Sequence, residues 1–243
     1  MRALNLNLHT GGNEVDYAAV SAVSLPERTE SYVPVPHATL FGMVRDTVTG
    51  AGLSVLNEVH ALNRGGKHYF AMMEVGLTSL ENTVKGFVVG LRNSYDKSLA
   101  AAMVAGDCVF VCSNLAFSGE YKLSRKHTVN VFADLPNMIA STVANLPAVW
   151  QSGNDRMNRY AAAALTDTAA HDTIAKLWRN GALLKTEIST AIDEWHKPSH
   201  PEFEPRTLWS LQNAATEAWK GGRLDTLSER SLAMYRTLDA VLA

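Results

Sequence analysis

Cysteine is almost absent from this chain of 243 residues, which excludes a disulfide-rich secreted scaffold. The two cysteines are Cys108 and Cys112. If both lie on one strand, they share a face at a separation of about 13 Å, given about 3.3 Å per residue. A disulfide requires Cα atoms within about 7 Å of each other. We therefore expect two reduced and mostly buried thiols.

Long hydrophobic runs are also missing. No uninterrupted run of about 18 apolar residues occurs, so the sequence predicts no helix that spans a membrane. Residues 1–25 lack a basic start followed by a continuous apolar stretch, so they do not have the pattern of a signal peptide. Together with reduced cysteines, these absences predict a cytoplasmic location.

The signatures of common catalytic sites are missing as well. The sequence contains no GxSxG nucleophile turn, no HExxH metal motif, and neither the GxxxxGK[ST] nor the GxGxxG phosphate loop. The pairs Gly11-Gly12, Gly65-Gly66 and Gly221-Gly222 are more simply turns or helix ends. Cys112 lies in an apolar stretch, where a thiol is expected to be unreactive. We predict no catalytic residue and no cofactor, which favours a protein that is not an enzyme.

Histidine spacing does not predict a metal site either. If Gly65-Gly66 forms a two-residue hairpin loop, His60 and His68 point to opposite faces of the hairpin and cannot share an ion. His196 and His200 flank a proline-rich turn with no carboxylate or thiol at zinc-finger spacing.

What is present predicts an α+β fold, with an antiparallel sheet and a packed helix in the first half and helices in the second. The clearest signal is Gly65-Gly66, which lies between residues 53–63 and 67–75 and predicts a hairpin. In that register Val59 faces Met72, Ala61 faces Phe70 and Asn63 faces His68. The hairpin then has an apolar face with buried Val59 and Phe70. Its other face is more polar and collects Glu58, His60, Arg64, Lys67 and Tyr69.

The other elements are predicted from periodicity and from glycine and proline positions. Residues 1–36 read as an extended arm with one or two short strands, and residues 37–51 as a helix that packs on the sheet. Further strands are predicted at 86–92, 108–112 and 115–123, whereas 99–105 fits either a helix or a strand. Asp134 is a candidate N-cap for the first helix of the second half. More helices follow near 148–165, 169–181, 183–196, 206–220 and 225–242, with His196–Pro205 as the best linker.

This pattern divides the chain into a β-rich region, 1–133, and a helical region, 134–243. The helices are short, and isolated short helices are marginal in water. We therefore predict that the helical region packs on the β-rich region and that the two unfold as one unit.

A local basic cluster is the main candidate for a binding surface. The whole chain has a net charge of −2, but residues 85–127 have a net charge of +3. Candidate contacts to nucleic acid or a partner are Arg92, Lys97, Tyr121, Lys122, Arg125, Lys126 and His127. Cations attract phosphates, and aromatic rings such as Tyr95 and Tyr121 can stack on bases. The alternative interpretation is a solvated rim without a partner.

Three stretches resemble a phage- and plasmid-borne family that is known as a domain of unknown function. They are GLRNSYDKS at 90–98, DCVFVCSNLAFSG at 107–119 and LWSLQNAATE at 208–217. The resemblance covers roughly residues 37–220. It implies an origin in a mobile element and a host-cell cytoplasm, but no activity. The positions that match its motifs are Asn93, Ser94, Asp96, Cys112, Ser113 and Asn114, together with Arg92. Asn and Ser at strand ends often tie turns together, so their role can be structural.

The order of elements is also similar to the core of phage single-strand annealing proteins, which work as oligomers without nucleotide hydrolysis. On this basis we expect a non-enzymatic protein that binds single-stranded DNA, in recombination or in DNA protection, and forms a homo-oligomer. The alternative is a phage protein that binds and inhibits a host defence protein. Neither hypothesis requires a membrane, a cofactor or a metal.

Overall fold

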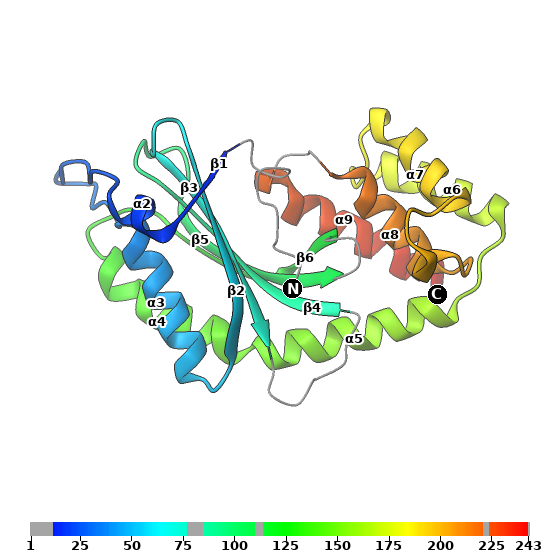
Figure 1. Ribbon diagram of the computed structural model, residues 1–243, viewed down its shortest axis with the longest axis horizontal. Helices are drawn as coiled ribbons and strands as arrows, with labels where there is room; N and C mark the ends of the chain where they lie inside the picture. The colour runs from blue at the N-terminus through cyan, green and yellow to red at the C-terminus, as the bar shows by residue number, and fades with distance from the viewer. Residues whose placement is uncertain (1–11, 77–84, 110–113, 221–223, 243) are drawn as a thin grey trace.

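The protein is built around one antiparallel sheet of six strands, in the order β1-β2-β3-β4-β5-β6 (Figure 1). The computed structural model describes residues 12–76, 85–109, 114–220 and 224–242. The strands are β1 (Asn13–Val15), β2 (Ser54–Asn63), β3 (His68–Gly76), β4 (Lys85–Ser94), β5 (Ala101–Val109) and β6 (Asn114–Arg125). Each strand pairs with the next along the chain, so no crossover is needed.

Helices cover the sheet and fill most of the second half of the chain. Two precede the hairpin, α2 (Tyr17–Ser21) and α3 (His37–Gly50). The others are α4 (Val131–Ala144), α5 (Leu146–Ala162), α6 (Asp167–Arg179), α7 (Ile188–His196), α8 (Leu208–Ala218) and α9 (Leu224–Leu242), with short 3₁₀ turns at Lys185–Glu187 and Pro201–Phe203. The predicted α+β class, with its antiparallel sheet, packed helix and helical second half, is confirmed.

The hairpin of β2 and β3 has the predicted register. Val59 pairs with Met72 and Ala61 with Phe70, and both Val59 and Phe70 are buried. The turn bond runs from the Gly66 N–H to the Asn63 carbonyl, at 3.1 Å. Arg64 has φ 52°, Gly65 has φ 65° and Gly66 has φ 86°, so the left-handed stretch begins one residue before the glycine pair. Glycine adopts such φ values without steric cost, which fixes the turn here.

The middle of the hairpin face that looked more polar, at His60 and Tyr69, is in fact buried, whereas Arg64 and Lys67 at its turn end are exposed. Tyr69 is 0% exposed and His60 is 3% exposed, and both lie under α3, where the Phe41 and His60 rings pack in a T-shaped arrangement with 4.6 Å between centroids. The phenol oxygen of Tyr69 lies 2.9 Å from Nδ1 of His60. Buried polar groups are tolerated when they pair with each other, so alternation of polar and apolar residues underestimated how much of this face is covered.

The sheet separates two hydrophobic cores. On one face α3, α4 and the start of α5 pack on a row of sheet residues that includes Ala71, Met73, Val89, Leu91 and Met103. On the other face α8 and α9 pack against the sheet, in a core that includes Val59, Ala61, Met72 and Val88, and α6 and α7 pack on α8 and α9 from outside. Helix α5 spans both cores, since its Trp150 belongs to the first and its Tyr160 to the second. Figure 1 shows α5 running along the sheet toward the α6–α9 helices.

The structure resolves one element that the sequence left open and differs from two local expectations. Residues 101–109 form β5, because Ala101, Ala102 and Ala105 are buried in the sheet, and that burial outweighs the preference of alanine for helices. Helix α4 begins at Val131, not after Asp134, whose carboxylate pairs with Arg125 at 2.7 Å. The predicted linker 196–205 packs on the protein through Phe203, which is buried.

Cys108 lies on β5, opposite Gly86 and Leu115, and Cys112 lies outside the described residues. The prediction of two reduced thiols therefore stays a prediction.

The division at residue 133 cuts through both cores, which leads to a prediction about the helical region. A fragment of residues 134–243 loses the sheet residues that complete the second core, and burial of apolar surface is the main stabilising term in folding. We expect it to show no cooperative thermal transition by circular dichroism, whereas the full chain unfolds in one step. A cooperative transition in a monomeric fragment would show that the helices form an independent domain.

Candidate functional site

A buried polar network organises one end of the sheet, around Asn93 near the end of β4. The side-chain amide of Asn93, which is 0% exposed, donates to the Val35 carbonyl at 2.7 Å and to Nδ1 of His37 at 3.0 Å. Its carbonyl oxygen accepts from Nε2 of His127 at 2.7 Å. One side chain therefore ties β4 to the start of α3 and to the segment that follows β6.

His37 extends this network to the hairpin turn. Its Nε2 donates to the Gly66 carbonyl at 3.0 Å, and its backbone N–H donates to the Tyr95 hydroxyl at 3.0 Å. The ring of His37 stacks on that of Tyr95 with 3.8 Å between centroids. Since Nδ1 accepts and Nε2 donates, the ring is neutral. Burial lowers the pKa of His37 to about 4, despite the opposing hydrogen bond to Gly66.

His127 is held inside the protein and not on its surface. It is buried beside the Tyr32 ring, with 5.7 Å between centroids, and its backbone carbonyl accepts from the Val33 N–H at 3.0 Å. Burial lowers the pKa of His127 as well, which favours the neutral ring. His127, which the sequence suggested as a binding residue, is therefore not available to a ligand. It instead holds the backbone next to Lys126 in place.

The turn after β4 is closed by Ser94, Asp96 and Ser98. The Ser94 hydroxyl donates to the Leu99 carbonyl at 3.1 Å and accepts from the Leu99 N–H at 2.9 Å. Oδ1 of Asp96 accepts from the Ser98 hydroxyl at 2.5 Å and from its N–H at 3.0 Å. Asn93, Ser94 and Asp96 thus use their side chains to fix the backbone, in line with a structural role for this part of the family motif.

Asp96, His68 and Ser98 resemble a catalytic triad in composition but not in geometry. Nε2 of His68 lies 2.7 Å from Oδ2 of Asp96 and 2.8 Å from the Ser98 hydroxyl oxygen. In a triad the acid and the nucleophile contact opposite ring nitrogens. Here the nitrogen that faces Ser98 carries the hydrogen donated to Asp96 and cannot accept a proton. Burial would raise the pKa of Asp96, but the hydrogen bonds from Ser98 and His68 outweigh it and lower that pKa, so the carboxylate is ionised.

Four cations surround this end of the sheet. Lys97 has φ 64° and places its Nζ 4.8 Å from the centre of the Tyr32 ring. Because Tyr32 also contacts His127, Lys97 lies near the segment that carries Lys126, which is exposed. On the hairpin side, the Lys67 carbonyl accepts from the Tyr95 N–H, and Arg64, with a side chain 64% exposed, lies 3.5 Å from Asp96. No acidic partner of Lys67, Lys97 or Lys126 occurs in the part of the chain that the structure describes.

The remaining candidate residues are placed differently. Arg125 is occupied by its ion pair with Asp134. Arg92 pairs with Phe70 and Ala102 in the sheet and is half-buried, on the opposite face from Asn93. Tyr121 and Lys122 lie on β6, and Asn114 begins that strand opposite Val109. Cys112 and Ser113 lie outside the described residues.

A groove of about 750 Å³ adjoins the cations. One wall is formed by residues 22–26, and the other by Leu62, the hairpin turn, Tyr95 and Asp96. Leu25 in this wall is exposed. Sequence reasoning missed Arg64, Lys67 and residues 22–26 as parts of a site. The signal available for the first two was their position beside Gly65-Gly66, since exposed turn tips often carry function.

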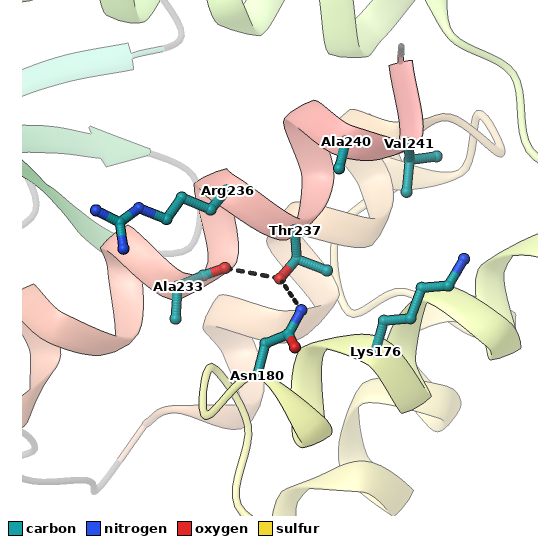
Figure 2. A pocket seen from close by; sticks show the side chains of 7 residues that line it. All are labelled: Lys176, Asn180, Ala233, Arg236, Thr237, Ala240 and Val241. Atoms are coloured by element: carbon teal, nitrogen blue, oxygen red, sulfur yellow. Dashed lines mark hydrogen bonds between the residues drawn. The ribbon is translucent and has the colours of Figure 1, made fainter.

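A second pocket, of about 420 Å³, lies between α6 and α9. Figure 2 shows Lys176 and Arg236 at its rim with side chains that point away from each other. Asn180 donates to Thr237 at 2.9 Å, and Thr237 donates to the Ala233 carbonyl at 2.8 Å. Its polar groups therefore satisfy one another, and its cations do not converge on one ligand.

Two further features, a metal-binding cluster of three or more side chains and a membrane-spanning helix, are absent from the described part of the chain. Its residues contain no group of three or more His, Cys, Asp and Glu side chains that could hold a metal ion. None of its helices is long and apolar enough to cross a membrane.

Known protein families offer one point of comparison. A family model described as "Domain of unknown function (DUF932)" matches residues 24–239. No curated protein and no solved structure matches significantly. The match is wider than the 37–220 expected from the three motif stretches, and it includes most of the groove and the Asn93 network.

The hydrogen bonds of Asn93 lead to a prediction about stability. Asn93→Ala leaves the His127 ring and the Val35 carbonyl buried without this partner, and it should lower the free energy of unfolding by about 3 kcal/mol. Urea denaturation measures this. Asn145→Ala, which removes an exposed side-chain bond to Ser141, is the matched control and should cost less than about 1 kcal/mol. Equal midpoints for the two variants would contradict the role given to Asn93.

The neutral state of His37 predicts a dependence of stability on pH. Its folded pKa of about 4 lies below the ordinary value of 6.5, so the unfolded chain binds more protons between these values. This contribution to stability is complete above pH 6.5 and decreases as the pH falls toward 4, by roughly 3 kcal/mol in total. His37→Asn should flatten the change in unfolding free energy across this window. Asn145→Ala, which changes no titratable group, should leave it as steep as in the wild type.

Proposed function

The chain belongs to the family described as a domain of unknown function (DUF932), and we propose that it is a non-enzymatic protein that binds single-stranded nucleic acid. The observation that carries the proposal is the arrangement of Arg64, Lys67, Lys97 and Lys126 around one end of the sheet. These cations come from three segments that are far apart in the sequence. The Asn93 network and the Tyr32 contacts hold those segments together.

Cationic side chains on a fixed backbone can bind the phosphates of a nucleic acid. Each lysine that contacts a phosphate displaces condensed counterions, which is the main sequence-independent source of affinity for nucleic acid. Lys67, Lys97 and Lys126 serve this purpose because none is engaged by a carboxylate within the described residues. Arg64 lies beside Asp96 and offsets its charge, so that this carboxylate repels a phosphate less.

The apolar surfaces beside these cations favour a single strand over a duplex. The two groove walls, with Leu25 in one and Leu62 in the other, can take an unstacked base, and Phe132, exposed on α4 close in sequence to Lys126, offers a ring face. Bases are accessible to such surfaces only when they are not paired. Phe132 takes the place that Tyr95 held in the sequence argument, because Tyr95 is buried against His37.

We assign this binding to recombination or DNA protection, by an annealing or coating protein that works as a homo-oligomer in the cytoplasm of a host cell. A helix before a meander of strands, followed by helices, supports the similarity to phage single-strand annealing proteins at the level of topology. Because fold does not fix function, the charged surface and not the topology is the basis of the proposal.

A second candidate is a protein that binds and inhibits a host protein. The observation that favours it is the arm beside the groove, where exposed Leu25 is followed by Glu27 and Glu30, also exposed. Carboxylates repel phosphates, whereas an apolar side chain with acidic neighbours suits a protein surface that is apolar and basic.

The substitution that separates the two candidates is Lys67→Ala, Lys97→Ala and Lys126→Ala in one chain. If these lysines bind phosphates, affinity for a single-stranded oligonucleotide falls. The slope of log affinity against log salt should also decrease in magnitude by about 2, at roughly 0.7 for each phosphate that is no longer neutralised. Fluorescence anisotropy at several salt concentrations measures both quantities.

The matched control changes three exposed lysines of the helical region, Lys176, Lys185 and Lys197, and should leave affinity and slope unchanged. The melting temperatures of both variants should stay near that of the wild type, because exposed lysines contribute little to stability. Absence of binding by the wild type at low salt would remove the nucleic-acid proposal and favour the protein partner, which is then sought by co-purification with wild type and with Leu25→Ser.

A further inference from the structure

Arg92 on β4 is a charged side chain that the fold itself does not use. The residue is half-buried, and its Nε atom is buried without a hydrogen-bond partner. No carboxylate among the described residues forms an ion pair with it. Charged groups that are taken out of water are normally paired or hydrogen-bonded. This guanidinium therefore lacks the anion that its surroundings favour.

The neighbouring positions of the family motif are all engaged inside the protein. The Asn93 amide joins β4 to the start of α3, and the Ser94 hydroxyl closes the turn after β4. The carboxylate of Asp96 accepts from His68 and from its own turn. Among the motif positions in residues 90–98, Arg92 is thus the one whose side chain has no partner in the described structure.

Arg92 belongs to a row of side chains that crosses the sheet to its edge. In the strand register the row runs through Ala61, Phe70, Arg92, Ala102 and Ser124. Residues directly opposite each other point to the same face, and Ala61 assigns this face to the second core. Phe70 and Ala102, on either side of Arg92, are buried, whereas Ser124 on the edge strand β6 is exposed. The row therefore joins the unpaired guanidinium to solvent at the sheet edge.

The same row connects Arg92 to the cationic surface. Neighbouring strands lie about 4.8 Å apart, so the Cα atoms of Arg92 and Ser124 are separated by about 10 Å across two strand spacings. Lys126 follows two residues after Ser124 and is exposed, with no acidic partner within the described residues. A guanidinium, a hydroxyl and an ammonium group thus follow one another. Such a series of donors suits a polyanion better than a single carboxylate.

We propose that Arg92 binds a backbone phosphate of a single-stranded nucleic acid, which crosses the β6 edge at Ser124 between Lys126 and Arg92. This assignment rests on the proposed function and extends it to the face of the sheet that carries the second core. The planar guanidinium can donate two parallel hydrogen bonds to one phosphate. Because the residue is half-buried between Phe70 and Ala102, salt screens this contact less than it screens a contact to an exposed lysine.

The substitution Arg92→Gln tests the phosphate contact by fluorescence anisotropy with a single-stranded oligonucleotide at several salt concentrations. We expect at least about fivefold weaker binding and a salt slope smaller in magnitude by about 0.7, the value for one phosphate of a single strand. Arg92→Lys keeps the charge but loses the planar fork, so it should retain the slope and lose only part of the affinity. The matched control, Arg179→Gln, removes one charge from an exposed position on α6 and should change neither quantity.

A stability measurement separates binding from a role in the fold. Arg92→Met replaces the unpaired charge by an apolar side chain and breaks no internal hydrogen bond or ion pair among the described residues. Without oligonucleotide it should melt at a temperature at least as high as the wild type, although it binds the oligonucleotide as weakly as Arg92→Gln. A clear fall in melting temperature in both variants would show that Arg92 stabilises the fold, and it would overturn the inference.

Two results distinguish failure of this inference from failure of the proposed function. If binding is lost in the triple lysine variant but Arg92→Gln keeps the wild-type affinity and salt slope, Arg92 does not contact a phosphate and the proposed function stands. If the wild type does not bind the oligonucleotide at low salt, both are wrong.

Discussion

The side-chain amide of Asn93 is the interaction on which the arrangement of this protein's candidate site depends. It lies in a buried part of the structure and uses both its donors and its acceptor on partners from three other positions in the chain. A buried amide without one of these partners would be left unsatisfied, at a cost of about 1–3 kcal/mol. The segments around residues 35, 93 and 127 are therefore held in one relative position. This also fixes the positions of the backbone that carries Lys97 and Lys126.

At this end of the sheet, burial separates the side chains that stabilise the fold from those that can contact a ligand. The side chains of Asn93, His37 and His127 are buried and hydrogen-bonded to one another, so they are not available to a ligand. The groups that remain available to a ligand are the long cationic side chains, which reach past the frame into water. This separates the family motif at residues 90–98 into a structural part, Asn93 to Asp96, and an exposed part, Lys97.

The same reasoning explains why the sheet needs helices from both halves of the chain. Its strands carry apolar side chains on both faces, so each face must be covered. Helices α3 and α4 cover one face and α8 and α9 the other, and α5 contributes to both cores. The candidate site at the sheet end consequently belongs to a packed body that both halves of the chain build.

The local elements could be predicted from the sequence alone: the hairpin and its register, the helix at 37–50, the helical second half and the family motif. These depend on turn glycines and on hydrophobic period, which act over a few residues. Long-range packing alone shows that His60 and Tyr69 are buried, that His127 and Arg125 are occupied, and that Lys67 and Lys126 lie at the same end of the sheet. Each of these depends on contacts between residues far apart in the chain, for which a single sequence carries no local signal.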